Sequence, residues 1–146
     1  MKPNILLVIL SLFLLSACSG SLSTLESSSR SSSLSVYPLT SEDADKVVIM
    51  AMTSQFSGSA ISRVEYPNKG YQATMRFLLD SHDITAYMIP VVGLSNGVKI
   101  DGFAFEVNHS GTMAISGSNR ADRVFKKIKE QATLIANPIP FSSYKH

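Results

Sequence analysis

The stretch that decides the fold runs from residue 71 to residue 79 and reads YQATMRFLL. Apolar residues alternate with polar ones from Tyr71 to Phe77, a period of two that is typical of a strand with one buried face. Turn-forming sequences bound it on both sides, PNKG at 67–70 and DSHD at 80–83. We therefore predict that a sheet forms the centre of the fold.

The period of two continues on both sides of this strand. Further strands are predicted over residues 61–66, 84–92, 98–108 and 112–116. Pro90 has no amide hydrogen for a ladder, so its strand lies at an edge or carries a bulge. The apolar side changes phase after Ile100, which places a bulge near Asp101 and Gly102. Because Asn96-Gly97 and the other turns are short, neighbouring strands run antiparallel and form a meander.

A helix is predicted on each side of the meander. A hydroxyl at 40–41 caps the first, whose apolar residues recur at steps of three and four up to about Gln55. A polar residue at 118–119 caps the second, which carries one apolar stripe and stops before Pro138. The predicted fold class is therefore α+β: an N-terminal helix, an antiparallel meander of four to five strands and a C-terminal helix, in two layers.

The first twenty residues have the layout of a secretory signal peptide. Lys2 supplies a basic start, residues 5–15 are almost wholly apolar, and residues 16–20 are small. As a helix, the apolar run would cover only about 16 Å of a hydrocarbon core that is about 30 Å thick. The run therefore directs targeting and takes no part in the fold.

The end of that run, Leu15-Ser16-Ala17-Cys18, resembles the lipobox of bacterial lipoproteins. The resemblance implies that residues 1–17 are removed, that the sulfur of Cys18 carries a diacylglyceryl group, and that the new amino terminus is acylated as well. Two or three chains give stable membrane attachment, whereas one chain gives only marginal binding. By resemblance to the enterobacterial sorting pattern, Ser19 favours the periplasmic side of the outer membrane. The alternative is an ordinary signal peptide with an incidental cysteine.

A serine-rich segment separates Cys18 from the predicted domain. Ten of the eighteen residues from 19 to 36 are serine, a composition that buries little apolar surface and is typical of a flexible linker. The predicted organisation is thus a signal peptide over 1–17, an acylated cysteine and spacer over 18–36, and one small domain over 37–146.

Composition excludes several classes of function. Only 16% of the residues are charged and the formal net charge is +2, which gives no reason to expect a nucleic-acid partner. The single cysteine excludes a disulfide framework and a cysteine-based zinc cluster. The serine-glycine-serine triplets at 57–59 and 116–118 lack the context of a nucleophile elbow. We predict a protein that is no enzyme and needs no cofactor.

One turn carries a local cluster of ionisable groups. His82 lies between Asp80 and Asp83, and His109 lies in a second turn that the meander can bring to the same end of the sheet. A catalytic zinc site needs three protein ligands, and aspartate and serine are ordinary turn residues. We interpret the cluster as a polar hairpin turn and predict neither a metal site nor a catalytic residue.

The last helix carries a basic face. Its cations are Arg120, Arg123, Lys126, Lys127 and Lys129. Such a face fits anionic head groups, a cell-wall polymer or an acidic protein surface, although a merely solvated face has the same pattern.

Together these features predict a lipid-anchored, extracytoplasmic interaction module of the cell envelope, non-catalytic, with a protein or polymer partner and a place in assembly or secretion. The alternative is a carrier of small apolar ligands. Its pocket would be lined by Met75, Phe77, Met88, Phe103 and Phe105.

Overall fold

The computed structural model describes residues 26–31, 35–77, 80–95, 97–112 and 114–140. The predicted signal peptide and Cys18 lie outside this part of the chain. In chain order the elements are β1 (Glu26–Ser31), β2 (Ser35–Val36), α2 (Ser41–Gln55), β3 (Ile61–Val64), β4 (Gly70–Phe77), β5 (Asp80–Ser95), β6 (Val98–Gly111), α3 (Ala114–Ile135) and β7 (Ile139–Pro140).

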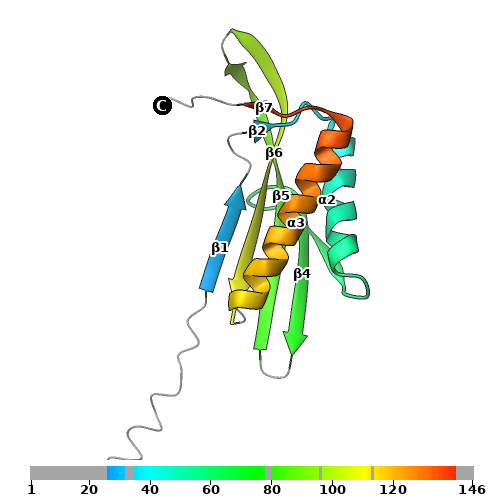
Figure 1. Ribbon diagram of the computed structural model, residues 1–146, viewed down its shortest axis with the longest axis vertical. Coiled ribbons are helices and arrows are strands. Elements are labelled where there is room, and N and C mark those ends of the chain that lie inside the picture. Colours follow the sequence, from blue (N-terminus) through cyan, green and yellow to red (C-terminus); the bar gives the residue numbers. More distant parts are fainter. Residues whose placement is uncertain (1–25, 32–34, 78–79, 96, 113, 141–146) are drawn as a thin grey trace, which may run out of the picture.

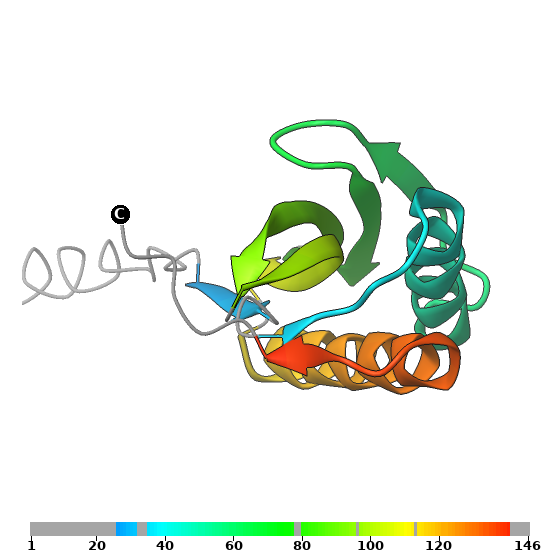
Figure 2. The same ribbon diagram turned by 90° about the horizontal axis from the view of Figure 1, so that it is seen from above.

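Five of the strands form one antiparallel sheet in the order β1-β6-β5-β4-β3, and β2 pairs with β7 in a second, two-stranded sheet. In Figure 1, α3 lies in front of the large sheet and α2 lies to its right, and the view from above shows the sheet curving around its helix-covered side (Figure 2). The prediction of an α+β fold with an antiparallel sheet and two helices is confirmed.

One hydrophobic core fills the space between the helices and the sheet. Side chains of alternate strand residues meet the apolar stripes of both helices there, as a period of two against a period of 3.6 requires. Burial of each large side chain contributes about 1.5–3 kcal/mol. The fully buried residues of this core include Val47, Val48, Met52, Ile84, Phe105, Val124 and Ile128.

The first predicted helix is α2, and its cap, Thr40, is one of the two hydroxyl residues predicted for that role. The Thr40 hydroxyl accepts the amide hydrogen of Asp43 at 3.1 Å, which satisfies a donor that the helix itself leaves free. The predicted place of this helix as the N-terminal element is wrong, however. Two strands, β1 and β2, precede it, and residues before 26 lie outside the described part of the chain.

The predicted fifth strand over 112–116 is also wrong, because α3 already begins at Ala114. A short apolar run fits a strand or a helix equally well, and tertiary contacts decide between them. Here the outer edge of β6 is occupied by β1, which is the fifth strand of the sheet.

The predicted bulge near Asp101 and Gly102 is absent, since the β5–β6 register runs without interruption from His82↔Gly111 to Ser95↔Val98. The apolar residues of β6 change from one face of the strand to the other because different elements pack against each face. Phe105 packs in the main core, whereas Ile100 points to the opposite face and packs with residues of β2 and β7. At Gly102 a Cβ would lie 2.2 Å from the Tyr37 carbonyl oxygen, so only glycine fits there.

Pro90 shows how the edge prediction holds in part. β5 is a central strand, but β4 pairs only with its first half, up to Tyr87. The amide of Met88 still donates to the Lys69 carbonyl at 2.8 Å. The main-chain nitrogen of Pro90, two residues further along β5, faces the same side of the strand but lies beyond the N-terminal end of β4. Its missing hydrogen therefore costs no ladder bond.

Part of the segment that was predicted as a spacer, residues 19–36, is paired in the sheets instead. Residues 26–31 pair with β6 as β1, and Val36 in β2 is fully buried. Composition alone favoured a linker, and the main-chain pairing of β1 depends on a partner about 80 residues away in sequence.

Candidate interaction surfaces

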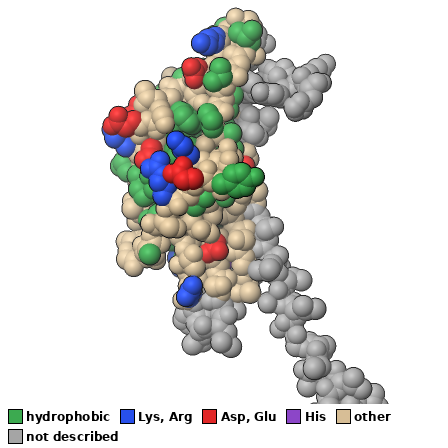
Figure 3. Space-filling model, turned by 180° about the vertical axis from the view of Figure 1, so that it is seen from behind, with side chains coloured by type: hydrophobic (Ala, Val, Ile, Leu, Met, Phe, Trp, Pro, Cys, Tyr) green, Lys and Arg blue, Asp and Glu red, His purple; other side chains and the backbone are tan. Residues whose placement is uncertain are grey.

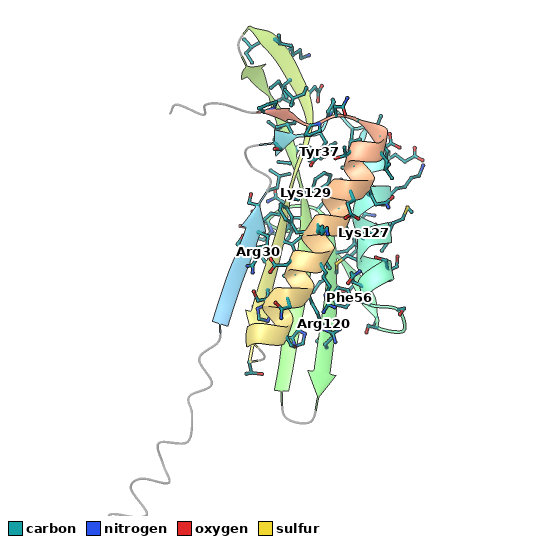
Figure 4. All side chains as sticks on the ribbon, viewed as in Figure 1. Arg30, Tyr37, Phe56, Arg120, Lys127 and Lys129 are labelled. Carbon is teal, nitrogen blue, oxygen red and sulfur yellow. The ribbon has the colours of Figure 1, made fainter. Side chains whose placement is uncertain are left out.

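The cations of α3 lie outside its buried stripe, which Ala121, Val124, Ile128 and Ala132 form. Because neighbours on a helix surface are three or four residues apart, Arg120, Arg123, Lys126 and Lys129 follow one another along the helix, and Lys127 is a neighbour of Arg123. Figure 4 labels Arg120, Lys127 and Lys129 along the helix.

Several of these cations have local contacts. Arg120 reaches the Met75 sulfur at 3.2 Å, and Lys129 lies 4.8 Å from the centre of the Phe125 ring. Lys126 and Lys127 approach Glu130 at 4.0 Å and 3.7 Å. Ion pairs this exposed are worth little energetically, so they position Lys126 and Lys127 only loosely.

A shallow depression of about 620 Å³ lies beside the C-terminal half of α3. Lys126, Lys127 and Lys129 line it together with Tyr37 and Leu134. Leu134 is 79% exposed, so this basic surface has an apolar side chain at its border. Cations around apolar contact area suit a partner that is acidic and partly apolar.

The tip of the β5–β6 hairpin is a second surface, which was not predicted from the sequence. Val92, Leu94 and Val98 are between 62% and 70% exposed, although each stands in a paired strand. The hairpin projects beyond the helices in Figure 1, and Figure 3 shows apolar side chains interspersed with charged ones at the same end of the rear face. The signal was present as apolar residues on both sides of Asn96-Gly97, but exposure depends on where the helices end.

A groove of about 330 Å³ lies beside the N-terminal end of β4 and the second half of β5. Met88, Pro90 and Phe103 line it together with Pro67 and Lys69 of the β3–β4 turn. Two of the five side chains predicted to line an apolar pocket, Met88 and Phe103, thus meet here.

Two of the other three predicted pocket residues, Met75 and Phe105, do not line this groove. Phe105 is fully buried in the main core, and Met75 is partly buried beneath Arg120. The side chain of Phe77 lies outside the described part of the structure. The predicted single pocket is therefore mostly packed core.

The two turns with histidine do meet at one end of the sheet, as the meander suggested. The rings of His82 and His109 lie edge to face with centroids 5.7 Å apart, and both are almost completely buried under α3. Burial, His109 and Arg120 lower the pKa of His82, while Asp83 opposes the shift. Within the described residues no three histidine, cysteine, aspartate or glutamate side chains gather as metal ligands do.

The aspartates beside His82 belong to other surroundings. Asp83 points to the opposite face of the strand, where it accepts a hydrogen bond of 2.6 Å from the Thr74 hydroxyl. The side chain of Asp80 lies outside the described part of the structure. The histidines are thus a packed pair beneath a helix rather than members of the predicted polar turn.

No family model matches the chain, and no curated protein matches it either. Among the residues that the structure describes, no helix combines the length and apolar character that crossing a bilayer requires.

Proposed function

We propose that the chain is a lipid-anchored, extracytoplasmic interaction module of a bacterial cell envelope, attached through Cys18 and without catalytic activity. The observation that carries this proposal is the sequence Leu15-Ser16-Ala17-Cys18 at the end of an apolar run of signal-peptide length. The chain has only one cysteine, and it stands where acylation requires it. The proposed location is the periplasmic side of the outer membrane.

Anchoring explains how a small domain with shallow surfaces can act. A tethered module meets its partner at an effective concentration in the millimolar range, so modest contacts suffice for binding. The basic depression beside α3 and the exposed apolar hairpin tip support a protein or polymer of the envelope as the partner. Assembly or secretion machinery is the setting that such a module fits.

The anchor is tested by Cys18→Ser, with Ser21→Ala as the matched control. The wild-type chain and the control should partition into the detergent phase and sediment with membranes, because two or three acyl chains hold them there. Cys18→Ser should lose both properties. Mass spectrometry should find an acylated Cys18 at the mature amino terminus, and a detergent-partitioning Cys18→Ser chain would contradict the proposal.

The contact surface is tested by reversing its charge. Arg123→Glu, Lys126→Glu and Lys129→Glu together should abolish a specific cross-linked complex in native membranes. Arg76→Glu, which changes an exposed cation on β4, should leave the complex intact. Equal cross-linking of both variants would remove α3 from the interface.

A second candidate function, carriage of small apolar ligands, is favoured by the groove between Met88, Phe103 and Pro67. Its volume lies at the lower end of the range for ligand sites. Extraction of the chain purified from native membranes should then release a bound small molecule, and Met88→Lys should abolish that release. A chain that yields no such molecule would contradict this candidate.

A further inference from the structure

β1 is attached to the domain in a different way from the segment that follows it. Its sequence, ESSSRS, contains no apolar residue, and six consecutive residues pair with β6 through the main chain. The next segment buries Val36 completely and Tyr37 to 97%. Apolar burial therefore fixes the chain from residue 36 onward, whereas it contributes little to holding β1.

Arg30 connects β1 to α3. Its guanidinium forms an ion pair with Asp122, and it donates a hydrogen bond of 2.5 Å to the Ser118 hydroxyl. Figure 4 shows Arg30 on the strand beside the helix. The Asp122 side chain is 53% exposed, so water and salt compete with this contact.

Ordering six polar residues costs conformational entropy that the ladder bonds, the ion pair and hydrogen bond of Arg30, and an exposed hydrogen bond from Ser29 to Glu106 roughly offset. We propose that β1 is a releasable strap: paired, it shortens the connection between Cys18 and the domain, and unpaired, it adds its own length to the spacer. The consequence for reach rests on the proposed acylation of Cys18.

The change in reach follows from chain length. At about 3.4 Å per residue, the connection from Cys18 to Glu26 spans at most about 27 Å, and that from Cys18 to Ser35 at most about 58 Å. Release of β1 thus about doubles the distance from the bilayer at which the domain can meet its partner. Val36 and Tyr37 keep the end of the lengthened spacer fixed in the fold.

Arg30 itself provides the probe, because it is the only lysine or arginine between residues 19 and 45. Trypsin can cut after Arg30 only while β1 is unpaired, and the cut separates the anchor from the domain. In native membranes carrying the full chain, we expect trypsin to release the domain well before it cuts inside the fold.

Asp122→Asn should raise the rate of this cleavage about threefold to fivefold, since it removes an exposed ion pair, and should leave the urea midpoint of the domain unchanged. The matched control is Asp101→Asn, an exposed aspartate on the hairpin far from β1. A disulfide between Ser29→Cys and Asn108→Cys, which face each other in the β1–β6 register, should block cleavage until it is reduced.

Equal cleavage rates in Asp122→Asn and Asp101→Asn, or cleavage only where urea unfolds the whole domain, would overturn the strap. The proposed function fails differently. A chain without acyl groups would be in the soluble fraction before trypsin is added, and mass spectrometry of the fragments would still report whether β1 opens.

Discussion

At the scale of single residues, His82 makes the stability of the fold depend on pH. Its ring is 96% buried, with the ring of His109 on β6 beside it, Arg120 of α3 near it and the uncharged Met75 opposite it on β4. Only Asp83 favours the charged form, and it stands on the other face of β5. Protonation of His82 therefore places a second positive charge in a buried site that already faces a guanidinium.

The sign of the pH effect follows from the lowered pKa of His82. In the unfolded chain the imidazole takes up its proton near pH 6.5, and in the folded chain only at lower pH. The free energy of unfolding should be constant above about pH 6.5 and should fall as the pH drops through the lowered pKa. His82→Gln should flatten that fall in urea titrations at pH 7, 6 and 5; an unchanged slope would show that other groups cause it.

Local chemistry explains why some residue-level predictions succeed. The Thr40 cap needs only an amide three residues away, so the sequence contains the whole interaction. Arg30 needs Asp122, which is 92 positions further along the chain, and a lone arginine among serines gives no hint of its partner. Residues that act through distant partners require the fold.

At the scale of elements, the close approach of α3 to β6 depends on a glycine. Gly117 is buried, and a Cβ there would lie 1.9 Å from Nε2 of His109. The His109 ring is 1% exposed, so it has no room to withdraw. This contact fixes where the first turns of the helix meet the sheet.

Gly117→Ala should therefore destabilise the domain by about 1–3 kcal/mol, even though alanine favours a helix by up to about 1 kcal/mol. Asn119→Ala, at an exposed position two residues on, is the control and should change stability by about 0.5 kcal/mol or less. Urea unfolding of both variants measures the difference. A Gly117→Ala chain as stable as the control would mean that α3 packs further from β6.

A sequence pattern predicts those elements whose own residues show a regular period or are bounded by turn sequences. α2 and most of α3 have a period near 3.6, and β4, β5 and β6 have turns at their ends, so all five were found. β1 is held by main-chain pairing, and its side chains carry no period, so it was interpreted as spacer. The start of α3 was missed because residues 112–116 fit a strand as well.

At the scale of the whole molecule, the sequence predicted two layers but not the second small sheet. That sheet pairs Val36 of β2 with Ile139 of β7 and covers the face of β6 opposite the helices. The change of apolar face along β6 was the signal for this second sheet, but it was interpreted as a bulge. The hairpin tip was not predicted as a surface, and of the residues that line the groove only Met88 and Phe103 were predicted to line a pocket.

The small cluster around Ile100 should stabilise the whole arrangement of hairpin, β2 and β7. Ile100 is fully buried there with Val36, whereas Val98, on the same strand and face, is 62% exposed. Ile100→Ala should cost about 2–4 kcal/mol and raise hydrogen exchange in the upper hairpin and around Val36 together, because both rely on its side chain. Val98→Ala, the matched control, should cost less than about 0.5 kcal/mol. If Ile100→Ala left exchange around Val36 unchanged, β2 would be held without the cluster around Ile100.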